Sequence, residues 1–164
     1  MVAQLTQPAG WEAAVPDPGQ LPTRKSIAAL EARLTVAEAK RAALLKHGDR
    51  LVAQFKSKYP DSPAYLVRYA DRTLNDYRWR LSGKAKWRHI GLPGNKVAVE
   101  LTGETGQKIL ASLPGVARVD WLRFEASRQA MNYESAMTKY EVMRLRSLIE
   151  RQELLRQLVR QGGT

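Results

Sequence analysis

Residues 24–58 carry the most restrictive pattern in the chain, because apolar side chains recur there at alternating steps of three and four. This spacing is that of a coiled-coil seam, so it predicts one long helix over residues 24–58. Thr23 or Ser26 is a suitable amino-terminal cap. Pro60 and Pro63 end the helix, because proline cannot continue the hydrogen-bond ladder. The seam comprises Ile27, Leu30, Leu34, Ala37, Arg41, Leu44, Gly48, Leu51 and Phe55.

Two seam positions are unusual. Arg41 interrupts the apolar pattern, and Gly48 either permits a close approach by a neighbouring element or marks a break in the helix.

A second long helix is predicted over residues 116–161, where Gly162 and Gly163 stop it. One apolar stripe runs along it and is expected to lie in a core or interface. The roughly 40 residues of sheet between the helices cannot bury both of them. We therefore expect the long helices to pair antiparallel with each other, or with a second copy. The stripe comprises Val119, Leu122, Ala126, Ala130, Tyr133, Met137 and Tyr140.

A sheet and a short helix are expected over residues 64–114. Residues 64–75 fit either a strand or a helix, with a slight preference for the helix. KVAVEL at 96–101 predicts a strand, and a short helix follows from Thr102 or Gly103 to Pro114. The fold class is thus α+β and helix-dominated, with two long helices bracketing a small three-stranded antiparallel sheet. It forms a single domain over residues 23–164, preceded by a flexible arm over residues 1–22.

The stretch RWRLSGKAKWR, residues 78–88, concentrates cations and tryptophans. A hairpin with a three-residue loop at 81–83 would place Tyr77, Trp79, Ala85, Trp87 and His89 on one face. The other face would then hold Arg78, Arg80, Lys84, Lys86 and Arg88. Burying the large apolar side chains is worth about 1.5–3 kcal/mol each, so this register is preferred.

The charge balance points to a polyanionic partner. The chain has 27 Lys and Arg against 16 Asp and Glu, a net charge of +11. Cations facing one another across strands repel, and a phosphate backbone would relieve that repulsion. We therefore expect DNA binding through Arg78, Arg80, Lys84, Lys86 and Arg88, with Lys108 holding one phosphate at a helix start. The alternatives are a solvated basic face, an anionic lipid surface, or a helical scaffold protein whose coiled-coil helices, through Leu30 and Leu44, bind a protein partner.

No catalytic constellation is evident. The chain lacks cysteine, and its two histidines, His47 and His89, lie in different elements without clustered carboxylates. In LTGETGQKIL, Gln107 separates Gly106 from Lys108, which breaks the nucleotide-binding pattern. We therefore expect a non-enzymatic protein without metal or cofactor. No apolar run or leader predicts a membrane partner, so a cytoplasmic protein, dimeric through the long helices, is expected.

Two resemblances bear on this interpretation. YRWRLSGKAKWRHIG resembles the Trp/Arg-rich hairpin in the arm-binding domains of phage-type tyrosine recombinases, which read DNA with a three-stranded sheet. The wider layout, with FEASRQAMNYESAM at 124–137, is similar to small integrase-regulator-like proteins of integrative and conjugative elements. These resemblances imply a regulatory or accessory factor of a mobile genetic element and no catalytic residues.

Overall fold

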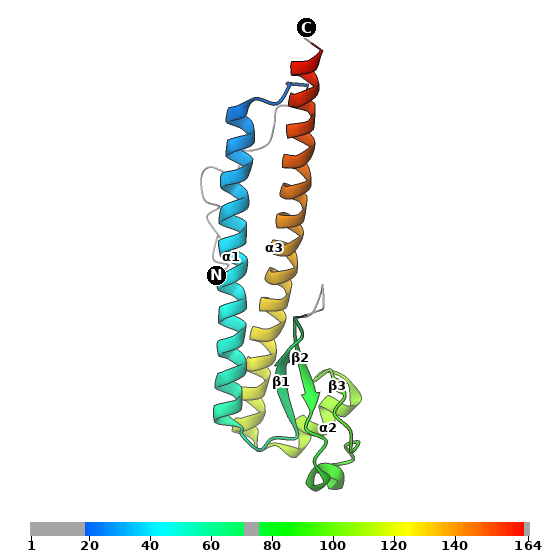
Figure 1. Ribbon diagram of the computed structural model, residues 1–164. Helices are drawn as coiled ribbons and strands as arrows, with labels where there is room; N and C mark the ends of the chain where they lie inside the picture. Colours follow the sequence, from blue (N-terminus) through cyan, green and yellow to red (C-terminus); the bar gives the residue numbers. More distant parts are fainter. Residues whose placement is uncertain (1–18, 71–75, 163–164) are drawn as a thin grey trace. The chain divides into compact units, whose positions relative to one another are not determined.

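The computed structural model describes residues 19–70 and 76–162, so the arm predicted over residues 1–22 lies mostly outside the described residues. The fold is helix-dominated and α+β, with a long helix at each end and a three-stranded antiparallel sheet, as predicted. In chain order the elements are α1 (Arg24–Lys58), β1 (Ala64–Arg68), β2 (Tyr77–Leu81), the 3-10 helix η2 (Ala85–Ile90), β3 (Ala98–Val99), α2 (Glu104–Ser112) and α3 (Gly115–Gln161) (Figure 1).

The chain divides into two compact units, and each long helix contributes to both. Of the described residues, the helical unit contains 19–40 and 138–162. The sheet unit is Arg41–Met137 and contains the sheet, η2 and α2.

In the helical unit, α1 and α3 run antiparallel and pack through apolar side chains (Figure 1). Leu30 and Ala37 of α1 are buried together with Val142 and Leu145 of α3. The amino-terminal part of the α1 seam is therefore used within the chain. Two ion pairs join the same helices, Arg33 with Glu141 at 2.8 Å and Arg146 with Glu38 at 2.6 Å.

The start of α1 is capped by the hydroxyl groups of Thr23 and Ser26. The backbone N–H of Ser26 donates to the Thr23 hydroxyl, and the N–H of Thr23 donates to the Ser26 hydroxyl, both at 3.0 Å. This reciprocal pairing satisfies amides that a helix start leaves open. The predicted bounds of the first helix, residues 24–58, are confirmed.

The core of the sheet unit is aromatic. Trp79 of β2 stacks on Trp121 of α3 with ring centroids 5.1 Å apart, and Phe55 of α1 meets both rings edge-on. All three side chains are almost completely buried. Offset stacking and edge contacts are the arrangements that aromatic quadrupoles favour. The end of α1, strand β2 and the first turns of α3 are therefore held on one core.

The sheet has the order β1-β2-β3, with β2 in the centre. Trp79 lies opposite Leu66 of β1 and Val99 of β3, so both edges of β2 are already paired at this position. The preference for a helix was wrong over residues 64–68, which pair with β2 and alternate buried and outward side chains as a strand does; residues 71–75 lie outside the described residues.

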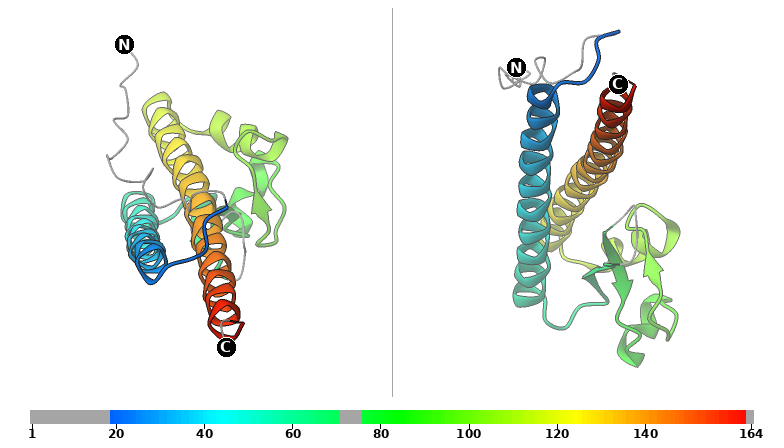
Figure 2. Two further views of the ribbon diagram at one scale, coloured as in Figure 1. Left: turned by 90° about the horizontal axis from the view of Figure 1, so that it is seen from above. Right: turned by 45° about the horizontal axis from the view of Figure 1, so that its top comes forward.

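The predicted hairpin was also wrong. Residues 85–90 form η2 instead of returning along β2, as the right-hand view of Figure 2 allows the reader to follow. Gly83 does adopt the left-handed conformation expected for the turn, with φ of 68°. The chain cannot pair there, because the N–H of Leu81 already donates to the carbonyl of Val97 and the other edge belongs to β1.

Both remaining helices lie where the sequence predicted them. Gly103 caps α2, which ends before Pro114, and α3 runs to Gln161. The expectation that α3 packs its apolar stripe against α1 of the same chain is wrong, whereas the alternative, a contact with a second copy, stays a prediction. The apolar stripe, from Val119 to Tyr140, is solvent-exposed, and a more polar side of the helix is buried instead.

Candidate nucleic-acid interface

The two faces of β2 differ in chemistry. Tyr77, Trp79 and Leu81 point into the core, whereas Arg78 and Arg80 between them point outward and are only partly buried. This separation of rings from cations on β2 agrees with the prediction, because side chains alternate along any strand.

The outer face of the sheet also contains residues of β1. Tyr65 is the cross-strand partner of Arg80, and Val67 is the partner of Arg78. The guanidinium of Arg78 lies 5.6 Å from the ring centroid of Tyr69, a cation–π contact. The outer face is thus cationic and aromatic at once.

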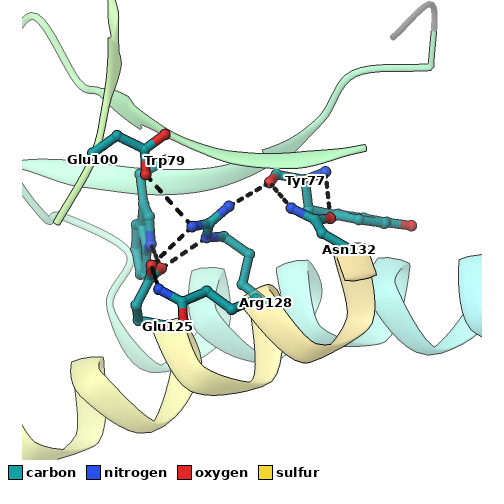
Figure 3. A network of polar contacts seen from close by, with 7 residues as sticks. Tyr77, Trp79, Glu100, Glu125, Arg128 and Asn132 are labelled. Carbon is teal, nitrogen blue, oxygen red and sulfur yellow. Dashed lines mark hydrogen bonds and ion pairs between the residues drawn. The ribbon is translucent and has the colours of Figure 1, made fainter. Parts of the chain in front are cut away.

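A buried polar network fastens β2 to α3 (Figure 3). The Trp79 indole N–H donates to Glu125 at 2.7 Å, and two nitrogens of Arg128 donate to the same carboxylate at 2.7 and 2.8 Å. A third nitrogen of Arg128 donates to the carbonyl of Tyr77. Glu125 and Arg128 are only 5% and 6% exposed, so their charges are stabilised chiefly by these partners.

Asn132, one turn further along α3, contacts the backbone of Tyr77 twice. Its side-chain oxygen accepts from the Tyr77 N–H at 3.1 Å, and its amide nitrogen donates to the Tyr77 carbonyl at 2.8 Å. Together with Arg128, this contact sets the height and direction of β2 and hence of its two outward arginines.

The network predicts a dependence of stability on acid. Burial disfavours the ionised form of Glu125, but hydrogen bonds from Arg128 and Trp79 outweigh it and hold the pKa of this carboxyl below its usual value. Ionised Glu125 therefore adds stability above its unfolded pKa of about 4.3, and this contribution is lost as pH falls through the lower folded pKa. We expect urea-unfolding free energies to fall in this acidic window, and to fall less for Glu125→Gln. Equal pH dependence in both proteins would contradict this prediction.

The ring of Tyr77 fixes β2 to α1 as well. Its hydroxyl oxygen lies 2.9 Å from two acceptors, the carbonyl oxygen of Leu45 and a carboxylate oxygen of Asp49, which share its single proton. Burial, followed by the contact with Asp49, raises the pKa of this hydroxyl well above its usual value. The Tyr77 ring occupies the space that a side chain at position 48 would fill. Gly48 therefore allows β2 to approach α1 closely, and the helix does not break there.

The loop after β2 carries the remaining predicted cations. Lys84, Lys86 and Arg88 are exposed, and the guanidinium of Arg88 lies against Gly94. The side chain of Arg80 donates to the carbonyl of Lys96, so the two ends of the loop meet. We call this set the basic surface: Arg78, Arg80, Lys84, Lys86, Arg88 and Lys96.

Trp87 and His89 do not occupy the strand positions predicted for them. Trp87 is partly buried and packs against the aromatic core from η2, and the ammonium of Lys86 lies 4.8 Å from its ring centroid. His89 and Ala85 are exposed, so the predicted aromatic face is wrong beyond Leu81.

One carboxylate lies within the basic surface. Asp61 forms ion pairs with Lys84, at 2.8 Å, and with Lys86. All three side chains are about half exposed. Such surface pairs contribute about 0–1 kcal/mol, so an incoming phosphate can replace Asp61 at little cost.

Lys108 lies at the margin of this surface. It is on α2, where its ammonium pairs with Glu104 at 2.8 Å, and its aliphatic chain lies beside Gly91 at the end of η2. The structure thus brings Lys108 close to the loop that carries Lys86 and Arg88.

Sequence reasoning missed three contributors, namely Tyr65, Tyr69 and Lys96. The alternation in AYLVR at 64–68 was the available signal for Tyr65, but a strand and a helix fit that short stretch almost equally well. Lys96 follows the turn at 92–95, and only the non-local pairing of Leu81 with Val97 places it beside Gly83.

Over residues 19–70 and 76–162, no group of three or more His, Cys, Asp or Glu side chains is arranged to hold a metal ion. Within the same ranges, no helix combines the length and apolar character needed to cross a membrane. No protein-family model matches the chain, and neither a curated protein nor a solved structure is significantly similar to it.

Proposed function

We propose that this protein binds duplex DNA through the basic surface and does so without catalysing a reaction. The observation that carries the proposal is the charge of one continuous stretch. Residues 77–99 contain six Lys and Arg and no Asp or Glu, and the six side chains project from β2 and its loop. With Asp61 counted, six positive charges and one negative charge leave a local excess of five.

The physical driving force is the release of counterions. Duplex DNA carries one phosphate charge per about 1.7 Å of axis and holds condensed cations, which binding of Lys and Arg sets free. Lys84, Lys86, Arg88 and Lys96 are exposed on a loop and suit contacts with phosphate oxygens.

Base recognition would fall to the sheet. Arg78 and Arg80 stand two residues apart on the outer face of β2, and arginine can donate two hydrogen bonds to the edge of guanine. The neighbouring residues Tyr77 and Trp79 anchor β2 to α1 and α3. The backbone that carries the two arginines is therefore held in place. A small sheet that enters the major groove is one established mode of DNA recognition.

Neutralising four cations of the basic surface, one on β2 and three on the loop, should weaken DNA binding strongly. For Arg80, Lys84, Lys86 and Arg88 each changed to Gln, we expect a loss of affinity on the order of a hundredfold or more, and a salt dependence shallower by up to about four units of log–log slope. Fluorescence anisotropy with a labelled duplex across a salt series measures both quantities. Single-stranded DNA and RNA of the same length serve as competitors.

The matched control neutralises four exposed cations on the helical unit, Arg24, Lys25, Arg151 and Arg160. Both variants carry the same net charge, so a general effect of charge would weaken them equally. Equal loss of affinity in both variants, or wild-type affinity in the variant of the basic surface, would refute the proposed site.

The biological setting that we propose is that of a regulatory or accessory factor on a mobile genetic element. Support for it comes from the resemblance to proteins of integrative and conjugative elements, which residues 77–80 and 124–137 carry. In that setting, a duplex from the end of such an element should bind more tightly than a random duplex of equal length.

A further inference from the structure

The apolar stripe of α3 is exposed on the sheet unit. Val119, Leu122, Tyr133 and Met137 are between 44% and 64% exposed, and the alanines between them are exposed too. The opposite side of the helix is occupied by Trp121, Glu125 and Arg128. An apolar strip of this length on a surface helix is characteristic of a contact site. We define the α3 stripe as Val119, Leu122, Ala126, Ala130, Tyr133 and Met137.

The α3 stripe is symmetric about residue 128. Val119 and Met137 stand nine residues to either side of that position, and Ala126 and Ala130 stand two residues to either side. At about 1.5 Å per residue, the stripe is about 27 Å long, with large side chains at both ends and small ones in the middle. A two-fold axis through the middle would bring two alanine pairs together, where the helices can approach closely.

Each side chain of the α3 stripe then has a partner at the same height in the second copy. With the copies antiparallel, Val119 faces Met137 and Leu122 faces Tyr133, so a large side chain meets another at each level. Leu122 and Tyr133 are 11 residues apart, which places them within about 20° of each other on the same flank of the helix.

Charge supports the same arrangement. Arg123 and Glu134 are also 11 residues apart, and they lie together on the opposite flank of the stripe. The antiparallel two-fold places Arg123 of one copy beside Glu134 of the other, twice per dimer. A parallel pairing would instead leave Arg123 of one copy and Glu134 of the other about 16 Å apart along the helices. The surface is thus complementary to itself in shape and in charge.

We propose that the α3 stripe is a homodimer interface, in which α3 pairs antiparallel with α3 of a second copy about an axis near residue 128. The interface does not involve the basic surface, so it is independent of DNA binding. The occupant is a second copy because the matching side chains and charges are found on the same helix.

Sedimentation velocity over a concentration series tests the dimer. Ala126→Glu should raise the dissociation constant of the dimer by about a hundredfold or more, because two unpaired carboxylates enter the contact. The matched control is Ser127→Glu, which adds the same charge one residue away and off the stripe. A wild-type protein that stays monomeric over the whole concentration series would overturn the proposal. Binding of a different protein by this monomer would not rescue it.

A charge swap tests the pairing. Arg123→Glu and Glu134→Arg should each weaken the dimer several-fold, and the double variant should restore it. Failure of the double variant to recover would contradict the antiparallel arrangement.

Disulfide mapping gives a readout that does not depend on affinity. The chain contains no cysteine, so V119C and M137C each introduce a single thiol. Oxidation should crosslink the two variants when they are mixed and leave each one alone largely uncrosslinked. Efficient crosslinking of V119C to itself would show a parallel pairing and would refute this geometry.

Discussion

Arg128→Leu is expected to lower the free energy of unfolding by about 3–5 kcal/mol, the largest loss among the substitutions considered. The change removes three hydrogen bonds to Glu125 and Tyr77 and leaves the Glu125 carboxylate buried with its counter-charge gone. A buried charge without its partner is far more costly than a missing pair, because water cannot replace what the arginine supplied. Urea denaturation followed by tryptophan fluorescence measures the loss, since Trp79 and Trp121 are both in this core.

Two further variants separate the cause. Replacing both Glu125 and Arg128 with leucine removes both charges, so the double variant should be more stable than Arg128→Leu alone. Arg151→Leu changes an exposed arginine on the same helix and should alter stability by less than about 0.5 kcal/mol. A double variant that is less stable than Arg128→Leu would contradict the role assigned to the pair.

Gly48→Ala is expected to destabilise the protein by about 1–3 kcal/mol, although alanine is the better helix former. A methyl group at this position would lie 2.3 Å from Cζ of Tyr77. The ring cannot move aside freely, because its hydroxyl is hydrogen-bonded to Leu45 and Asp49. Overpacking therefore outweighs the gain in helix propensity of about 1 kcal/mol.

Gly115→Ala is the matched control for this prediction. Gly115 is the first residue of α3, and a methyl group there would have no neighbour within 4 Å. Alanine should therefore leave stability unchanged or raise it slightly. If the two substitutions changed the free energy of unfolding, measured in urea, in the same direction, the predicted clash of the new methyl group with Tyr77 would be contradicted.

The long helices were predictable from sequence because their signals are local. Alternating steps of three and four over many turns, with prolines and glycines at the ends, define residues 24–58 and 115–161 within one residue. The pairing of strands was not predictable in this way. A hairpin around Gly83 satisfies every local rule, but two distant segments, 64–68 and 97–99, take both edges of β2.

The orientation of α3 shows a second limit of pattern analysis. An apolar stripe ordinarily faces a core or an interface, and on that ground residues 119–140 were expected to pack against the other long helix or against a second copy. Glu125, Arg128 and Asn132 look like a solvent-facing side in the sequence, yet they are buried because they satisfy one another and the backbone of Tyr77. Only the three-dimensional arrangement reveals such mutual satisfaction, and the stripe that it leaves outside carries the interface proposed above.

The double contact of Asn132 with Tyr77 has a consequence for self-association. The ladder between β2 and β3 stops at the Trp79–Val99 pair, and the next backbone groups of β2 on that side belong to Tyr77. An open pair of N–H and C=O groups is a template for an added strand from another molecule, and hence for aggregation. The Asn132 amide fills that position as a residue of a neighbouring strand would. The edge is thus closed to strand addition, and Asn132→Leu, which leaves the buried Tyr77 N–H without an acceptor, should lower the free energy of unfolding measured in urea by about 1–3 kcal/mol.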